Sequence, residues 1–241
     1  MFGTMARHEM KNLLRDKMTL FLAAYPIAIG LALRYLAAEG IIAGQALNIS
    51  AVLLCLITGF SFGAIAGMSL LDDRDDLVLH SIQISPVPVW KYIWLKIAFV
   101  YVLALIGGVM IIWISGALKM SLMQNLLISA LSAMQVPFLA FLINAFAKNK
   151  VEGFVAMKGS GFLLVFPVAG FFFLDSKEWL FAIAPGHWAS KAVQYLLLQP
   201  AISAGLTRMN LSFYSYLAIG FAYNALFAVL AYSMFKRRNA Y

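Results

Sequence analysis

The chain has 241 residues, of which 63% are hydrophobic and only 12% are charged, and its mean hydropathy is +0.87. A soluble domain of this size is excluded, because too much apolar surface would face water. The sequence therefore predicts an integral membrane protein. Its net charge of +8 is explained by lysines and arginines in cytoplasmic loops, so we expect no nucleic-acid partner. The single cysteine, Cys55, excludes an intramolecular disulfide and lies in an apolar run typical of a small packing residue.

The N-terminal residues favour an amphipathic helix on the membrane surface. Met10, Leu13 and Leu14 recur at helical spacing, while Arg15 lies off that apolar stripe. The first seventeen residues are too rich in charge to hold the uncharged core of a cleavable secretion signal. We expect the first apolar run to be retained as a membrane span.

Six apolar runs are long enough to cross a bilayer, at about 18–38, 49–71, 94–118, 121–147, 157–174 and 210–235. Pro137 is expected to kink the fourth span, and residues 148–158 are expected to form a short polar loop before the fifth. Gly59, Gly63 and Gly67 recur at four-residue spacing in the second span. Such a face allows close helix packing, either within the chain or between two copies. No linker or repeat divides residues 1–241, so we expect one transmembrane domain.

The segment 175–208 is apolar in two parts that are each short for a span, at 179–185 and 192–205. Gly186, His187, Trp188 and Lys191 separate them. Two short re-entrant or interfacial helices fit this pattern better than a seventh crossing. With six crossings, most lysines and arginines lie on the side of both termini, which predicts that the termini are cytoplasmic.

Several kinds of chemistry are disfavoured. Ser160 and His187 lie at opposite ends of the fifth span, too far apart for a catalytic dyad. The spans have no ionisable group near mid-membrane, where an ion-coupled carrier needs one. Arg34 is expected to extend to the outer surface and Lys96 to the inner one. The chain has no Walker A phosphate-binding loop and no cluster at metal-ligand spacing, so we expect neither an ATPase nor a metal site here.

The densest run of charge follows the second span on the cytoplasmic side. Asp72, Asp73, Arg74, Asp75 and Asp76 precede Leu77, His80 and Ile82, and Pro86 and Pro88 end the run. We expect a short helix with these acids in its first turn, where carboxylates stabilise the positive end of the helix dipole. A solvated loop is the competing interpretation.

With that run, the sequence resembles the permeases of the ABC-2 type exporter family. The likeness rests on the surface helix, the six spans, the acid-Arg-acid run leading through Pro86 and Pro88 to Tyr92 and Lys96, and the Pro185-Gly186 break before the last span. The family often has glutamate where this chain has aspartate. Only 72–96 is motif-like, whereas the rest of the likeness is the pattern of spans.

The resemblance implies an all-α permease that binds no cofactor itself and works in a bacterial cytoplasmic membrane. It implies a second permease subunit, identical or related, and two copies of an ABC ATPase that carries ATP and Mg²⁺. The ATPase would dock on the surface helix and on a coupling helix formed by the acidic segment. The leading substrate class is an amphipathic antibiotic or drug. The alternatives are a lipid or glycan exporter, a non-transporting anchor or sensor subunit and, with less support, an ion-coupled carrier or membrane enzyme.

Two sets of residues are candidates for the transport path. Aromatic and methionine side chains in spans one, two and five can line a path for a hydrophobic substrate or face lipid: Tyr25, Phe60, Phe62, Met68, Phe162 and Phe166. Side chains around the break before the last span fit an outer gate at headgroup level: Trp179, Pro185, His187 and Trp188.

Overall fold

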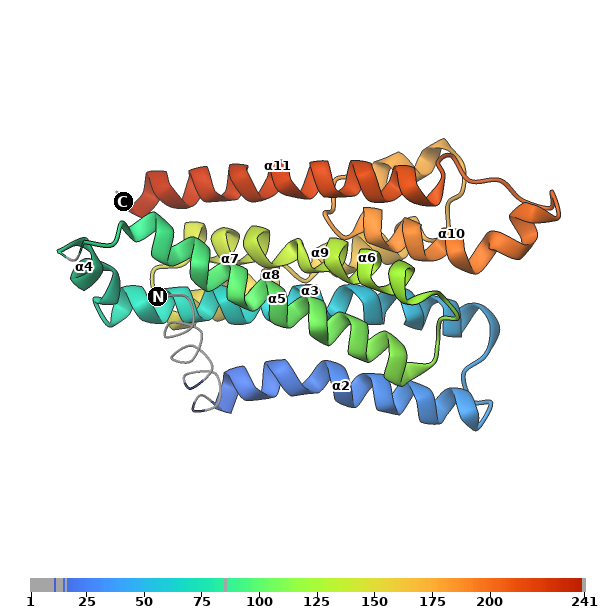
Figure 1. Cartoon of the computed structure of the whole chain (residues 1–241), viewed down its shortest axis with the longest axis horizontal. Helices are drawn as coiled ribbons and strands as arrows, with labels where there is room; N and C mark the ends of the chain where they lie inside the picture. The colour runs from blue at the N-terminus through green and yellow to red at the C-terminus, as the bar shows by residue number, and fades with distance from the viewer. Residues whose placement is uncertain (1–10, 12–14, 16, 85, 240–241) are drawn as a thin grey trace.

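The computed structural model describes residues 11, 15, 17–84 and 86–239. The described part of the chain is helical and contains no strand (Figure 1). Its elements are α2 (Lys17–Ala38), α3 (Gly44–Asp75), α4 (Val78–Gln83), α5 (Val89–Ser115), α6 (Leu122–Ala133), α7 (Gln135–Phe146), α8 (Lys150–Gly159), α9 (Phe162–Gly170), the 3₁₀ helix η1 (Ser176–Phe181), α10 (His187–Ser203) and α11 (Phe213–Asn239).

Six spans are long and apolar enough to cross a membrane in the described residues, which confirms the number predicted. They are α2, α3, α5, the pair α6–α7, the pair α8–α9, and α11. Figure 1 shows the long helices side by side along the long axis of the molecule. Several ends differ from the prediction. α3 begins at Gly44 and continues to Asp75, and α5 begins at Val89, directly after Pro88.

The fourth span is interrupted at Met134, between α6 and α7. Pro137 is the third residue of α7. A proline has no N–H and its ring crowds the carbonyl four residues earlier, which here belongs to Ala133, the last residue of α6. The predicted kink therefore lies one turn before the proline rather than at it.

The predicted polar loop at 148–158 is wrong over most of its length, because Lys150–Gly159 forms α8. Its polar residues stabilise the start of that helix. The Asn149 side chain accepts a hydrogen bond from the Glu152 N–H at 3.0 Å, and a Glu152 oxygen accepts one from the Lys148 N–H at 2.8 Å. Such caps satisfy N–H groups that have no partner within the helix. The fifth span then breaks at Ser160-Gly161 before α9.

α3 lies at the centre of the bundle, and most of its residues are buried. Gly59, Gly63 and Gly67 face α6 and α7. A Cβ atom at Gly59 would lie 2.2 Å from the Ser132 carbonyl oxygen, and a Cβ at Gly67 would lie 2.9 Å from Ile143. The Asn144 amide also donates to the Gly67 carbonyl at 2.8 Å. The glycine face therefore packs within the chain, as small residues do where membrane helices approach closely.

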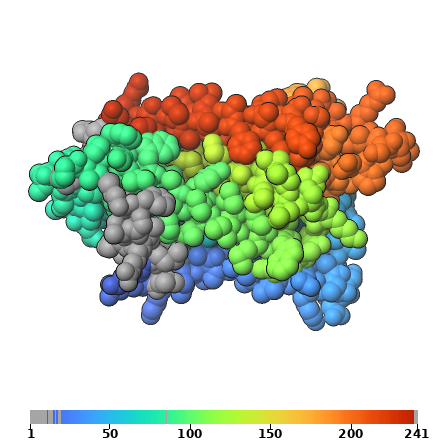
Figure 2. All heavy atoms as spheres, viewed as in Figure 1, coloured from blue at the N-terminus to red at the C-terminus, as the bar shows by residue number. Residues whose placement is uncertain are grey.

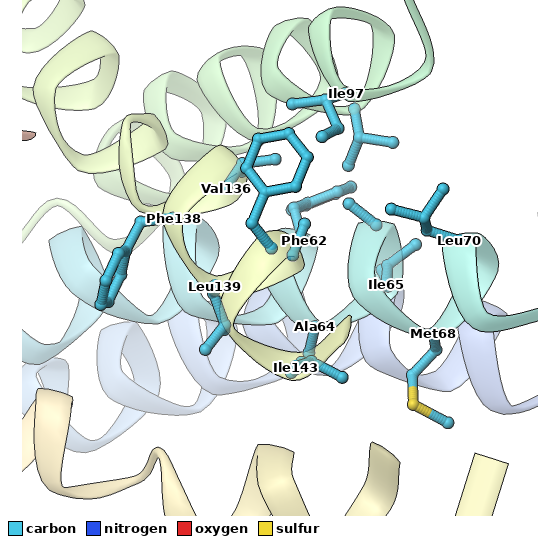
Figure 3. Packing of buried hydrophobic residues seen from close by; sticks show 14 of the residues in the cluster. Phe62, Ala64, Ile65, Met68, Leu70, Ile97, Val136, Phe138, Leu139 and Ile143 are labelled. Atoms are coloured by element: carbon cyan, nitrogen blue, oxygen red, sulfur yellow. The ribbon is translucent and has the colours of Figure 1, made fainter. Parts of the chain in front are cut away.

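Apolar side chains from α3, α5 and α7 fill the space beside this contact. Figure 3 shows Phe62 of α3 extending toward Val136 of α7 and Ile97 of α5. Met68 points away from Leu70 on the same helix. The core thus joins α3 to α5 and α7.

The two ends of the bundle are built differently. In Figures 1 and 2, α4 and the last turns of α11 lie at one end of the molecule, and the segment joining α10 to α11 lies at the other. We call the first the α4 end and the second the α10 end. Residues that were predicted from the sequence to be functional lie at both ends of the molecule.

Candidate functional site

The acidic run lies at the end of a long helix and not at the start of a short one. Asp72, Asp73, Arg74 and Asp75 form the last turn of α3, and α4 begins only after Leu77, whose φ is 58°. The prediction of acids in the first turn of a short helix is therefore wrong. Nothing in the sequence after span two breaks the helix before Asp75. Carboxylates are unfavourable at the negative end of a helix dipole, so these acids need cationic partners.

The Asp73 carboxylate binds cationic and hydroxyl groups inside the protein. Its Oδ2 accepts from the Lys96 ammonium of α5 and, at 3.0 Å, from the Tyr92 hydroxyl. Lys96 also donates to the Ser69 carbonyl at 3.1 Å, and only 1% of the lysine is exposed. The expectation that Lys96 extends to the inner surface is wrong. Because both charges are buried, each depends on the other.

Asp72 and Arg74 join α3 to two further helices. Asp72 pairs with Lys150 at the start of α8 at 3.0 Å, and Arg74 donates to the Ala147 carbonyl at the end of α7 at 2.7 Å. A cation at a helix carboxyl end is favourable. We call Asp72, Asp73 and Arg74 the α3 joint, because they connect the end of α3 to α5, α7 and α8.

The remaining residues of the run face outward. Asp75, Asp76, Leu77 and His80 are exposed, whereas Ile82 is half-buried and Leu79 is buried. Leu77 is 60% exposed and Ile84, just after α4, is 92% exposed. We call Asp75, Asp76, Leu77 and Ile84 the α4 face. It combines two acids with two apolar side chains at the end of the molecule.

The residues proposed for the surface helix are mostly outside the described part of the chain. Met10, Leu13 and Leu14 belong to this group, so the amphipathic surface helix stays a prediction. Arg15 is described, and it is helical and exposed.

The six residues proposed for the substrate path have different surroundings in the structure. Phe62 and Met68 are buried in the core, and Phe60 packs against it. Tyr25 of α2 accepts a hydrogen bond from Ser61 of α3 at 2.9 Å. Phe162 and Phe166 contact each other at 6.0 Å between ring centroids, and Phe162 is 51% exposed. None of the six is among the residues that line the cavities between α2 and α3, between the ends of α2 and α5, or between α5 and α11.

The four residues proposed for an outer gate do lie together. The rings of Trp179 and Trp188 are 6.2 Å apart, and His187 contacts Trp188 edge-on at 5.5 Å. The Pro185 carbonyl accepts from Asn224 of α11 at 3.1 Å. Trp179 is 41% exposed, while Pro185, His187 and Trp188 are buried.

The predicted short helices of this region have different bounds from those expected. The first is the 3₁₀ helix η1, which ends at Phe181, and the second, α10, begins at His187 rather than at 192. The first half of α10 is buried, and the helix packs against α3, α6, α9 and α11.

Beside the proposed gate residues lies a buried polar cluster that sequence reasoning missed. The Lys191 ammonium is 2.8 Å from Glu178 Oε2 and 2.9 Å from Gln194 Oε1, and both charged side chains are 0% exposed. Tyr216 of α11 donates to Glu178 Oε1 at 2.9 Å. Lys191 and Gln194 also donate to the Phe173 and Phe171 carbonyls. The cluster holds η1, α10, α11 and the end of the fifth span together.

His187 lies near this cluster without a hydrogen-bond partner for either ring nitrogen among the described residues. Burial, together with the charge of Lys191, lowers the pKa of His187 to about 3, so its ring is neutral. Burial also lowers the pKa of Lys191, although Glu178 opposes this shift. No group of three or more potential metal ligands occurs in the part of the chain that the structure describes.

The fold and its two ends define a multi-pass membrane protein with six apolar spans, a charged joint at one end and packed short helices at the other. Residues 9–232 match the model of the family described as fluoroquinolones export permease protein Rv2686c-like. The chain belongs to this family, which confirms the resemblance to export permeases seen in the sequence.

Two curated relatives agree with this assignment. They are the fluoroquinolones export permease proteins Rv2686c and MT2760 of two Mycobacterium tuberculosis strains, H37Rv and CDC 1551 / Oshkosh. Each is 29% identical to this chain over 132 residues, which are 54% of this chain and 52% of the relative. The matched region thus spans about half the length of these relatives.

Proposed function

We propose that this protein is the permease subunit of an ATP-driven exporter and that a separate ATPase binds at its α4 end. The observation that carries the proposal is the family match over residues 9–232, which covers α4 and all of α11 except its last turns. The proposed orientation puts this end in the cytoplasm, where ATP is present. Lysines and arginines gathered there support that orientation.

The α4 face has the properties of a docking surface for a partner protein. Ile84 and Leu77 present apolar side chains to the outside, and Asp75 and Asp76 stand beside them without an ion pair among the described residues. A partner groove with basic residues at its rim complements this combination. Leu77 also adopts a left-handed conformation that costs a bulky residue free energy. Such outliers are typical of functional sites.

The α3 joint supplies a route from that surface into the membrane. Movement of α4 acts directly on the end of α3, which is held to α5, α7 and α8 by Asp73, Arg74 and Asp72. A packed, charge-paired joint moves as a unit. ATP-dependent closure of two ATPase subunits would therefore shift several spans together in a pair of permeases.

The proposed substrate class is an amphipathic antibiotic-like molecule, because the family and both relatives are named for export of fluoroquinolones. The test is affinity purification of the full chain from its host in mild detergent. We expect an ABC ATPase to copurify with vanadate-sensitive hydrolysis, and cells that overproduce both subunits to tolerate more fluoroquinolone. Repeated purification without an ATPase would overturn the proposal.

Reversal of the exposed acids tests where the ATPase docks. Asp75→Lys with Asp76→Lys is expected to lower ATPase recovery at least tenfold and leave the permease folded, since neither side chain pairs with another of the residues that the structure describes. Glu39→Lys changes an exposed acid at the other end and serves as the control. Equal recovery with the double variant and with the control would place the docking site elsewhere.

A further inference from the structure

A cavity at the α4 end lies between the start of α5 and the last turns of α11. Its volume is about 360 Å³, and its lining residues are Gln83, Val89, Trp90, Ile93, Tyr232, Phe235 and Lys236. Ile93 and Phe235 are buried at its base, whereas Trp90 is 58% exposed. The cavity therefore has an apolar floor and an aromatic rim that reaches outward.

The lining of this cavity carries a positive charge. Lys236 lines it, and no lining residue is acidic. Lys91 and Arg237 are exposed neighbours of Trp90 and Lys236 in the chain. The nearby acids Asp72 and Asp73 are already paired with Lys150 and Lys96. The ammonium of Lys236 thus has no carboxylate partner among the described residues.

The position of the cavity matches the headgroup level of one leaflet. α5 and α11 are both membrane spans, and the cavity lies where the first begins and the second ends. Tryptophan prefers this level of a bilayer, and lysine side chains extend toward it. The inner leaflet carries anionic lipids that attract basic residues.

We propose that this cavity binds one anionic phospholipid of the inner leaflet, with its phosphate at Lys236 and an acyl chain over Trp90, Ile93 and Tyr232. The proposal rests on the orientation proposed above, with the α4 end in the cytoplasm. Gln83 is the last residue of α4 and lines the same cavity. The bound lipid therefore contacts α4, α5 and α11 together and stabilises α4 in its position for the ATPase.

Native mass spectrometry of the full chain measures this binding without an ATPase, so its outcome is independent of the proposed transport function. The purified protein is incubated in detergent with phosphatidylglycerol or with phosphatidylcholine at equal concentration. We expect one phosphatidylglycerol to be retained in preference to phosphatidylcholine. Lys236→Gln should lower this retention about fivefold, the effect expected of one lysine near an anionic lipid.

Two further variants distinguish lipid binding in the cavity from a general attraction of the lipid to positive charge. Val89→Trp fills the cavity without changing charge and should also lower retention. Lys148→Gln removes an exposed lysine from the same end of the molecule, away from the cavity, and should leave retention unchanged. Gel filtration verifies that each variant is folded.

Three results would overturn the proposal. The first is equal retention of the two lipids by the unchanged protein. The second is an equal loss with Lys148→Gln and Lys236→Gln, which would indicate a diffuse charge effect. The third is full competition by soluble glycerol phosphate at the lipid's concentration, which would show that a free phosphate and not a lipid occupies the site.

Discussion

At the scale of single residues, the main finding is that the aspartates after the second span have different roles. Asp73 is buried against Lys96, whereas Asp75 is exposed and forms no ion pair within the described part of the chain. Removal of one member of a buried ion pair leaves the other charge unpaired, which costs about 3–5 kcal/mol. Removal of an exposed charge costs about 0.5 kcal/mol or less.

We therefore expect Asp73→Asn to destabilise the protein strongly and Asp75→Asn to leave its stability unchanged. Thermal unfolding in detergent, followed by tryptophan fluorescence, measures both. The double variant Asp73→Asn with Lys96→Met should recover part of the loss, because no buried charge then remains unpaired. A single Asp73→Asn variant as stable as the unchanged protein would show that this pair does not hold α3 to α5.

At the scale of helices, the contact between α3 and α6 depends on the absence of a side chain at Gly59. A Cβ atom there would lie 2.2 Å from a backbone oxygen, which cannot move aside as a flexible side chain can. Gly59→Ala should therefore destabilise the protein by about 3 kcal/mol, the upper end of the cost of overpacking. Gly159→Ala is the matched control, because nothing lies within 4 Å of a Cβ at Gly159. Equal thermal stability of the two variants would contradict the close helix contact.

The helices also show how much of the fold and of the candidate site could be predicted from the sequence. Hydropathy and length were sufficient for six spans, since each span must satisfy its backbone inside the bilayer. The end of α3 was misplaced because aspartates favour the start of a helix, whereas here ion pairs with Lys150 and Lys96 stabilise Asp72 and Asp73 at the end of one. The partnership of Glu178 with Lys191 and Tyr216 was not foreseeable, because only the packing of η1, α10 and α11 brings these residues together. Of the candidate site residues, the gate group was brought together and the substrate-path group was not.

At the scale of the whole molecule, an even number of crossings places α4 and the end of α11 on the same side of the membrane, opposite the segment between α10 and α11. The excess of lysine and arginine at the α4 end predicts that this side is cytoplasmic. Both the ATPase and the lipid proposals depend on this orientation. It is therefore the property of the whole chain that most needs a direct test.

Cysteine labelling in intact cells provides that test. Cys55 is 1% exposed, so the unchanged protein should not react with a membrane-impermeant maleimide and serves as its own background. Ser81 of α4 and Ser203 of α10 are both exposed, and each can be replaced by the nearly isosteric cysteine. We expect Ser203→Cys to be labelled in intact cells and Ser81→Cys only after the membrane is permeabilised. Labelling of Ser81→Cys in intact cells would invert the orientation and place the α4 face where no ATP-driven partner can reach it.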